Sequence, residues 1–266
     1  MTYRALAFDL DGTLLDADSV LTPTVLRALK IAGERGVKVF LVSGRMVPSM
    51  VPYWRQLQLT TPLVGYNGAK AVRPPDPPLW SQTLPIALTR EIIAYARARQ
   101  WALQVYFNDM LYPLYDLPFN RQYAEFARVE FKVLPSNGEL PTGEPNKALV
   151  VCEPEDLAAV TVEMTAFIAG RAEVVTSSGL YCEVMPRGVN KAVGLKHAAA
   201  AEGLTLAEIV AAGDGPNDRE MLEQCGVGLA ITTGDAELNR VIPRHIPAMP
   251  DGGVERVLDE FFGIKI

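Results

Sequence analysis

The sequence has 266 residues, of which 49% are hydrophobic and 21% are charged, and its formal net charge is −6. This composition is typical of a globular protein and is too apolar for an intrinsically disordered chain. The acidic balance and the lack of a dense Lys/Arg run disfavour nucleic acid as a partner. No apolar run reaches the roughly 18 residues that a membrane-spanning helix needs, so no membrane partner is expected either.

Cysteine and histidine are scarce in the chain, with three and two residues respectively. The cysteine spacing fits no metal knuckle, and the odd number argues against a disulfide framework. Residues 1–4 lead directly into a strand-like segment and show no signal-peptide pattern. Together these features predict a reducing, cytoplasmic location.

The first part of the chain alternates between strand-like and helix-like segments, which predicts an α/β fold with a largely parallel sheet. Thr22 followed by Pro23 is a typical helix start, with a capping residue and a proline in the first turn. The predicted strands cover residues 5–10, 37–42 and 63–64, and the predicted helices cover residues 23–33 and 48–57.

The composition changes at residues 73–78, which read Arg-Pro-Pro-Asp-Pro-Pro. Such a segment fits neither a helix interior nor a central strand, so it predicts a loop near a domain boundary. Beyond it, helices are predicted at residues 88–100, 118–126 and 155–169, and strands at residues 102–107, 111–115, 130–134, 148–152, 173–176 and 181–185.

From residue 190 the parallel pattern resumes. Helices are predicted at residues 191–201, 218–224 and 251–262, and strands at residues 209–212 and 227–231. The simplest architecture is one α/β core interrupted by a second domain. We expect the core to comprise residues 1–81 and 186–266, and the inserted domain to comprise residues 82–185.

Two aspartates, Asp9 and Asp11, directly follow an apolar strand and precede a glycine. The carboxyl ends of strands are where open α/β sheets bind ligands. Alternation along the chain sends the two side chains to the same side of Leu10. Their carboxylates repel each other unless a cation lies between them, and Mg²⁺ prefers such oxygen ligands. Taken alone, however, this pair more often belongs to a solvated turn at a strand end.

Other polar residues also lie at strand or helix ends. Ser43 and Gly44 follow the second strand and offer a hydroxyl and backbone amides for phosphate, although Ser-Gly alone is usually a turn. The segment 213–218, Gly-Asp-Gly-Pro-Asn-Asp, offers two carboxylates at the start of a helix, where an ordinary turn is the alternative. Lys191 lies at a helix start, where a solvated surface lysine is the simpler explanation.

Together, these segments resemble the motifs of the haloacid dehalogenase-like (HAD) hydrolases, specifically the Cof-type, sugar-phosphatase-like members. Residues 9–13, Asp-Leu-Asp-Gly-Thr, match the first motif, and residues 43–45, Ser-Gly-Arg, match the second. Lys191 matches the third motif, and residues 213–218 match the fourth. Residues 65–69, Gly-Tyr-Asn-Gly-Ala, are similar to the segment that precedes the cap domain in this group.

The resemblance implies a Rossmann-like parallel-sheet core with helices on both faces and an inserted α+β cap domain. It also implies a phosphatase that acts on a small phosphorylated metabolite, such as a sugar phosphate. Asp9 would attack phosphorus and form an aspartyl-phosphate. Asp11 would protonate the leaving alcohol and then activate water.

The same resemblance implies Mg²⁺ as the cofactor and a phosphate ester as the small-molecule partner. The metal site would comprise Asp9, the backbone carbonyl of Asp11, Asp214 and Asp218, the last directly or through a neighbouring ligand. The phosphoryl oxygens would be held by Ser43, Gly44, Lys191 and Asn217. Loops of the cap domain would set specificity, with Tyr112 and Arg121 as candidates that ordinary packing explains equally well.

One segment departs from the family pattern, because Asp235 stands in Thr233–Ala236 where family members often have asparagine. Several alternatives remain open. Phosphatases specific for mannosyl-3-phosphoglycerate, sucrose phosphate or trehalose phosphate share the expected fold. A catalytically silent phosphometabolite-binding protein belongs to another class, but it would be expected to lose Asp9 or Asp11. The physiological substrate and the oligomeric state do not follow from the sequence.

Overall fold

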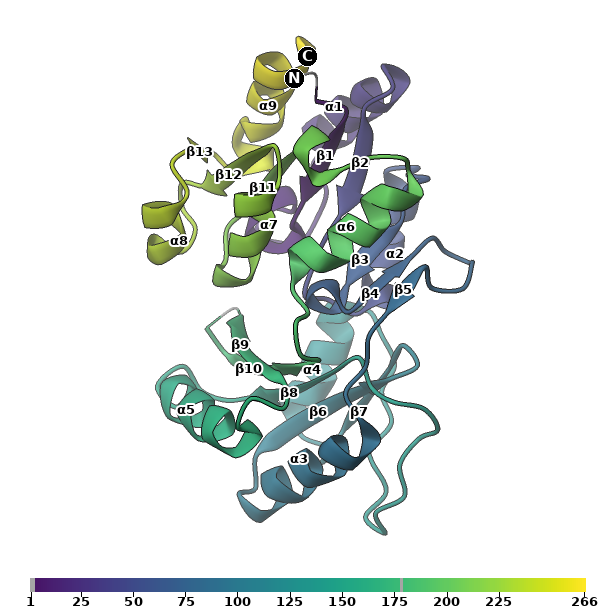
Figure 1. Ribbon diagram of the computed structural model, residues 1–266, viewed down its shortest axis with the longest axis vertical. Helices are drawn as coiled ribbons and strands as arrows, with labels where there is room; N and C mark the ends of the chain where they lie inside the picture. The colour runs from purple at the N-terminus through teal and green to yellow at the C-terminus, as the bar shows by residue number, and fades with distance from the viewer. Residues whose placement is uncertain (1–2, 178) are drawn as a thin grey trace. The chain divides into compact units, whose positions relative to one another are not determined.

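A computed structural model describes residues 3–177 and 179–266 (Figure 1). Residues 1 and 2, part of the segment in which the sequence shows no signal peptide, lie outside the described residues. The described chain forms two compact units. The first runs up to Gly44 and then comprises Met50–Trp80 and Asn190–Ile266. The second comprises Arg45–Ser49 and Ser81–Val189.

The first unit is built on a five-stranded parallel sheet with the strand order β13-β12-β11-β1-β2. Its strands are β1 (Ala5–Phe8), β2 (Lys38–Leu41), β11 (Ile209–Gly213), β12 (Val227–Ile231) and β13 (His245–Ile246). The central strand β1 pairs with β11 on one side and with β2 on the other. The carboxyl ends of these three strands therefore meet at one edge of the sheet, as the sequence predicts.

Helices lie on both sides of this sheet (Figure 1). They are α1 (Pro23–Glu34), α2 (Val47–Gln56), α6 (Lys191–Ala201), α7 (Arg219–Gln224), α8 (Ala236–Val241) and α9 (Gly253–Phe262). Ala5 and Ala7 pack in one apolar cluster with residues of α6 and α7. Strand alternation turns Leu6 and Phe8 to the opposite side, where both are buried. The predicted α/β core with helices on both faces is confirmed.

A small three-stranded sheet, with the strand order β3-β4-β5, adjoins the end of β2. It contains β3 (Leu63–Gly65), β4 (Lys70–Val72) and β5 (Trp80–Ser81). Only the first of these strands is predicted from the sequence. The proline-rich residues 73–78 form the loop between β4 and β5, as predicted.

The second unit is an antiparallel sheet with the order β7-β6-β8-β10-β9. Its strands are β6 (Ala102–Phe107), β7 (Met110–Pro113), β8 (Lys147–Val151), β9 (Glu173–Ser177) and β10 (Tyr181–Met185), and its helices are α3 (Ile86–Ala98), α4 (Pro118–Ala127) and α5 (Leu157–Ile168). Alternate residues of β6, Leu103, Val105 and Phe107, pack in an apolar cluster with α3 and α5. Gln104 and Tyr106 point to the other face.

The strand predicted at residues 130–134 is wrong. Backbone N–H groups of Lys132 and Leu134 donate to carbonyls of β7, but only a single bridge, between Leu111 and Phe131, is formed. Pro113 of β7 has no N–H group with which to donate back to this segment, so the ladder stops after one bridge. The segment is therefore an irregular stretch beside β7.

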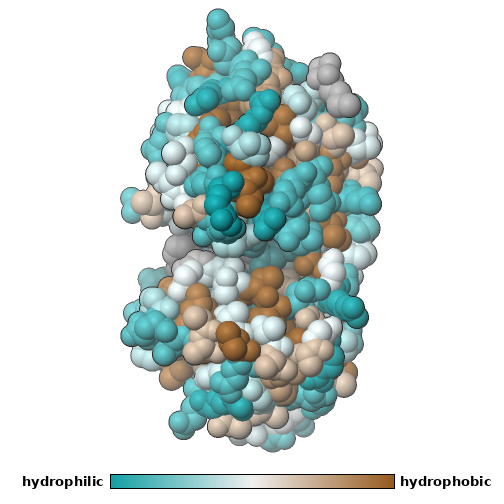
Figure 2. Space-filling view, turned by 60° about the vertical axis from the view of Figure 1, so that its left-hand side comes forward, coloured by the Kyte–Doolittle hydropathy of each residue, from teal (hydrophilic) through white to brown (hydrophobic). Residues whose placement is uncertain are grey.

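Large apolar side chains on the surface are scattered. Among the side chains that the structure describes, the exposed ones are Val20, Leu79, Val133, Val162 and Ile266. The face shown in Figure 2 likewise has hydrophobic residues interspersed with hydrophilic ones. Within the described part of the chain, no helix combines the length and the apolar character needed to cross a membrane. The three cysteines have free thiols.

Candidate active site

Asp9 lies at the carboxyl end of the central strand of the first unit. Its backbone N–H donates to the carbonyl of Ala212 in the neighbouring strand β11 at 3.1 Å. The chain then turns sharply through Leu10–Leu14. Gly12 in this turn has φ +75°, and a Cβ atom added to it would lie 2.4 Å from Oδ2 of Asp214. Only glycine allows the turn to approach Asp214 this closely.

Thr13 fixes the orientation of Asp214. Its hydroxyl donates to Oδ1 of Asp214 at 2.8 Å, and its side chain is fully buried. The sequence places Thr13 in the first motif but assigns it no role. A hydroxyl two residues after Asp11 is the only sequence signal of this contact.

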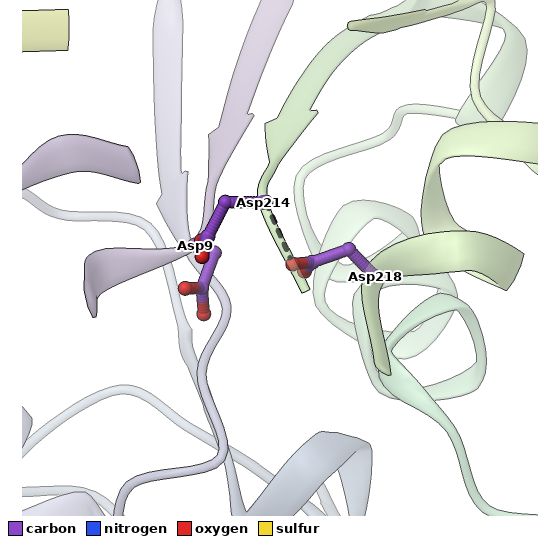
Figure 3. Close-up of side chains that lie close together, drawn as sticks. All are labelled: Asp9, Asp214 and Asp218. Carbon is purple, nitrogen blue, oxygen red and sulfur yellow. Dashed lines mark hydrogen bonds between the residues drawn. The ribbon is translucent and has the colours of Figure 1, made fainter. Parts of the chain in front are cut away.

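Three carboxylates meet at this edge of the sheet (Figure 3). Asp9, Asp214 and Asp218 each offer an oxygen atom, and these atoms lie within 4.8 Å of one another. Asp9 follows β1, whereas Asp214 and Asp218 come from the loop between β11 and α7. The parallel pairing of β1 with β11 thus brings together residues that lie about 200 positions apart in the sequence.

Lys191 connects two of these carboxylates. Its Nζ donates to Oδ1 of Asp9 and to Oδ1 of Asp218, both at 2.7 Å, and its side chain is only 1% exposed. It is the first residue of α6, a position that the helix dipole makes unfavourable for a cation. The two buried ion pairs account for its presence there.

Asp218 also shapes the loop that carries Asp214. Its Oδ2 accepts a hydrogen bond from the backbone N–H of Asp214 at 3.1 Å (Figure 3). The same oxygen accepts from the backbone N–H of Gly215 at 3.0 Å. Its other oxygen accepts from Lys191. With both oxygens engaged by the protein, Asp218 is well placed to orient the neighbouring groups.

The electrostatics of the cluster are unbalanced. Burial raises the pKa of Asp9 well above its usual range, Lys191 opposes this rise, and the carboxylates of Asp218 and Asp214 add to it. Burial and the Asp218 carboxylate likewise raise the pKa of Asp214 to about 6, against the hydrogen bond from Thr13. Burial opposes the charge of Lys191, but the carboxylates of Asp218 and Asp9 outweigh it and raise the pKa of Lys191.

The residues of this cluster fit a hard divalent cation. One lysine neutralises one negative charge, so the three carboxylates retain net negative charge when all are ionised. The donor set consists of carboxylate oxygens, the ligands that Mg²⁺ prefers. A cation beside them would relieve the repulsion that raises the pKa values of Asp9 and Asp214.

Asp11 lies beside this cluster without belonging to it. Its side chain is partly exposed, and the three clustered oxygens come from other residues. Its carboxylate is nevertheless close enough to contribute to the raised pKa of Asp9. A partly solvated carboxylate near a buried one is a suitable arrangement for proton transfer.

The predicted phosphate-binding residues lie around the same strand ends. Ser43 follows β2, is buried, and donates its backbone N–H to the carbonyl of Val64 at 2.9 Å. Asn217 immediately precedes Asp218, and its Nδ2 donates to Oδ1 of Asn67 at 2.9 Å. The predicted role of Gly44 rests on its place directly after Ser43. Asn67 belongs to the segment that resembles the family, but the resemblance assigns it no function.

Other residues singled out from the sequence have ordinary structural contacts. Tyr112 lies in β7 rather than on a loop and packs edge-on against Phe107, with ring centroids 5.9 Å apart. Arg121 lies on α4 and forms an exposed ion pair with Asp116.

Asp235, the departure from the family pattern, is the N-cap of α8. Its carboxylate accepts the backbone N–H of Leu238 at 2.8 Å, and its own N–H donates to the carbonyl of Asp214 at 2.7 Å. Asparagine and aspartate cap helices about equally well. With aspartate at this position, the cap of α8 is kept, and so is the backbone hydrogen bond to the carbonyl of Asp214.

Comparison with known proteins gives a consistent set of relatives. The family model described as haloacid dehalogenase-like hydrolase matches residues 6–258. Among curated proteins, 5-amino-6-(5-phospho-D-ribitylamino)uracil phosphatase YitU of Bacillus subtilis is 27% identical over 273 residues, covering 97% of each chain. An HMP-PP phosphatase of Yersinia pseudotuberculosis is 27% identical over 247 residues, covering 91% of this chain and 88% of its own.

Solved structures share the fold of the whole chain. TM0651 from Thermotoga maritima superposes with a TM-score of 0.83 at 27% identity, covering 97% of each chain. BT4131, described as a HAD subclass IIB sugar phosphatase, superposes with a TM-score of 0.84 at 18% identity, covering 98% of this chain and all of its own. At that lower identity the likeness concerns the fold alone.

Proposed function

Because the chain belongs to the haloacid dehalogenase-like hydrolase family, we propose that it is a Mg²⁺-dependent phosphatase that acts on a small phosphorylated metabolite through Asp9. The observation that carries this proposal is the cluster of the buried Asp9 and Asp218 with the half-buried Asp214 around Lys191. A chain that needed only to fold would not be expected to bury this excess of negative charge. The named relatives, which are phosphatases, support the same reaction class.

In the first proposed step, a carboxylate oxygen of Asp9 attacks phosphorus, and the bond between phosphorus and the leaving oxygen breaks. Asp11 donates its proton to that oxygen, and the alcohol leaves. In the second step, Asp11 removes a proton from water as the water oxygen attacks the aspartyl-phosphate. The bond between phosphorus and Asp9 then breaks, which releases inorganic phosphate and restores both carboxyl groups.

Lys191 is proposed to hold a phosphoryl oxygen while it orients Asp9. An ammonium group has three N–H donors, and the bonds to Asp9 and Asp218 use two of them. We propose that the third donates to the substrate. We propose Ser43, Gly44 and Asn217 as further donors to the phosphoryl oxygens, since fixed donors of this kind supply much of the catalysis in phosphoryl transfer.

We propose Asp9, the backbone carbonyl of Asp11, and Asp214 as metal ligands, supported by Asp218. When bound there, Mg²⁺ would neutralise charge on the phosphoryl group and allow a carboxylate to approach it. The hydroxyl of Thr13 fixes the orientation of the Asp214 carboxylate, and Gly12 allows the turn after β1 to lie close to it. Both residues thus favour a metal ligand at Asp214.

The substrate class is proposed from the relatives. Two of them are named for a phosphorylated ribitylaminouracil and for HMP-PP, and this chain is matched over most of its length to both. We therefore place phosphorylated heterocyclic metabolites beside sugar phosphates as first candidates. We further propose that residues 82–185 act as the cap domain that selects among them, since every residue assigned to the chemistry lies in the first unit.

The test is release of phosphate from an aryl phosphate by the wild-type protein with Mg²⁺, by the same protein with a chelator, and by Asp9→Asn. We expect turnover only in the first case. If the wild type releases no phosphate above the Asp9→Asn background, the proposed activity is wrong. A panel that includes sugar phosphates and the two relatives' substrates then ranks kcat/KM values.

A catalytically silent phosphometabolite-binding protein is the second candidate. It would bind inorganic phosphate with Mg²⁺ but release none from any ester in the panel. Retention of both Asp9 and Asp11 favours the enzyme, because binding alone requires no nucleophile and no proton donor. Calorimetric titration with phosphate, run beside the turnover assay, separates the two functions.

A further inference from the structure

The turn between β3 and β4 has a backbone that few side chains tolerate. Tyr66, Asn67 and Gly68 follow one another with φ values of +53°, +50° and +95°. Among non-glycine residues, asparagine enters this left-handed region more readily than most. Strained positions of this kind persist where the surrounding structure holds them, and they are often functional.

Contacts within the first unit hold this turn in place. A Cβ atom on Gly68 would lie 1.9 Å from the carbonyl oxygen of Asn190, so only glycine fits there. The carbonyl of Gly68 accepts a hydrogen bond from Nε1 of Trp80 at 3.1 Å. The Trp80 ring in turn stacks on His197 of α6. The turn is therefore fixed by residues on two other segments.

Asn67 points from this turn toward two loops of the candidate active site. Its Oδ1 accepts the hydrogen bond from Nδ2 of Asn217, which lies 150 residues away in the sequence. The same oxygen lies 2.9 Å from where a Cβ atom on Gly44 would be. The backbone N–H of Asn67 donates to the carbonyl of Ser43 at 3.1 Å. The residue is only 3% exposed.

We propose that Asn67 is a positioning residue that holds the Ser43–Gly44 loop and Asn217 in register for binding of the phosphoryl group. This inference rests on the proposed phosphatase function and adds to it a residue that does not itself touch the reacting atoms. The left-handed backbone aims the amide at Asn217 in the loop that follows β11, while the backbone N–H of Asn67 bonds to the loop that follows β2. A loss of this link would loosen Asn217 without removing any group from the phosphoryl site.

The central variant is Asn67→Gly, which removes the amide but keeps a residue that adopts φ +50° without strain. With the aryl phosphate and Mg²⁺, we expect KM and the inhibition constant for inorganic phosphate to rise about 10-fold, the equivalent of one lost hydrogen bond to a substrate-binding group. A fall in kcat of up to about 100-fold fits a misplaced donor.

A double-mutant cycle tests the route through Asn217. If Asn67 acts by holding Asn217, then Asn67→Gly in an Asn217→Ala background should change these constants by less than about threefold. Effects that multiply in full would overturn the inference. Trp80→Phe is a graded comparison, because it removes the bond to Gly68 but keeps the Asn67 amide and an aromatic ring on His197. It should change the inhibition constant by less than Asn67→Gly does.

Calorimetric titration with inorganic phosphate and Mg²⁺ separates the two levels of the proposal. If the wild type turns over the aryl phosphate and Asn67→Gly matches it in KM, kcat and phosphate affinity, the inference is wrong and the phosphatase stands. If the wild type is inactive, the proposed function is wrong. A weaker phosphate affinity of Asn67→Gly would then still support the positioning role, and an equal or absent affinity would overturn it.

Discussion

Both units of this protein bury charged side chains, but they do so in opposite ways. In the first unit, one lysine lies among three carboxylates, and the pKa of Asp9 is driven well above its usual range. In the second unit, Lys147 and Glu183 form an ion pair at 2.8 Å between one positive and one negative side chain, each about 2% exposed. The first arrangement leaves charge unbalanced, whereas the second cancels it.

The pair in the second unit is also well satisfied by its neighbours. Ser177 donates its hydroxyl to the other carboxylate oxygen of Glu183. The ammonium group of Lys147 lies 5.0 Å from the centroid of the Tyr106 ring, within reach of a cation–π contact. Lys147 and Glu183 lie diagonally opposite on adjacent antiparallel strands, on the face shared with Tyr106.

The contrast separates two reasons for burying charge. A balanced, hydrogen-bonded pair tolerates burial, although an apolar pair of the same volume often does as well. An unbalanced cluster is costly by itself and becomes favourable only when a further cation arrives. We therefore interpret the first cluster as a ligand site and the second as a packed element of its sheet. Substitutions in the first cluster should therefore change activity most, and substitutions in the second should change stability most.

The largest effect is expected from Asp9→Asn. Loss of the nucleophile should lower kcat/KM by more than about 10³-fold, equivalent to about 4 kcal/mol. In metal-free buffer the same variant should unfold at an equal or higher temperature, because a neutral amide replaces a costly buried carboxyl group. Phosphate release and thermal melting, measured on one preparation, check the expected loss of activity and the expected unfolding temperature. Turnover close to the wild type would remove Asp9 from the mechanism.

Glu183→Gln should show the reverse behaviour in the second unit. It leaves Lys147 buried without its partner charge, which typically destabilises a protein by about 3–5 kcal/mol. Urea unfolding followed by Trp101 fluorescence, in a background with Trp54 and Trp80 replaced by phenylalanine, reports on this unit.

The matched control is the double variant Lys147→Met/Glu183→Leu. It removes both charges, so it should recover most of the stability lost in Glu183→Gln. If the single and double variants are equally destabilised, then the pair does more than cancel its own charge.

The pH dependence should reveal the unbalanced cluster. The pKa of Asp214 rises from an ordinary 3.8 to about 6, so the folded protein binds this proton more tightly than the unfolded chain. Without metal, the stabilisation from this group is complete below about pH 4 and is lost as the pH rises through about 6. Mg²⁺ needs the ionised carboxylate, so its stabilising effect should grow over the same range.

At 100 times its dissociation constant, Mg²⁺ should stabilise the protein by about 2.7 kcal/mol. Melting curves with Mg²⁺ and with chelator at pH 5 and pH 7.5 measure the difference. We expect a small shift at pH 5 and the full shift at pH 7.5. A shift that does not depend on pH would place the bound metal away from Asp9 and Asp214.

Much of the fold follows from the sequence because its main elements have clear signals. The Thr22 cap, the apolar strand before Asp9 and the alternation after residue 190 give strands and helices whose observed ends differ by only a few residues. The strands β4, β5 and β13 are not predicted because segments of two or three residues carry no measurable periodicity. The family resemblance is confirmed by the match over residues 6–258.

The site is predictable in its composition but not in its contacts. The four motifs identify Asp9, Lys191, Asp214 and Asp218, and the structure brings these residues together. The paired bonds of Lys191 depend on the register of β1 against β11, which the sequence does not specify. The position of Asn67 depends on three successive left-handed residues, and only the asparagine and the glycine among them hint at such a turn.

The smallest effect is expected at Asp235, a carboxylate close to the unbalanced cluster but with a different task. An asparagine at this position would keep the N-cap of α8, so Asp235→Asn should retain activity within about twofold. Asp235→Ala removes the bond to Leu238 and should cost about 1 kcal/mol of stability. The backbone bond from residue 235 to Asp214 survives in both variants, so KM for the aryl phosphate should change little. Urea unfolding and steady-state kinetics of the two variants test this. A large gain in activity for Asp235→Asn would mean that the Asp235 charge acts on the cluster itself and belongs with the unbalanced group.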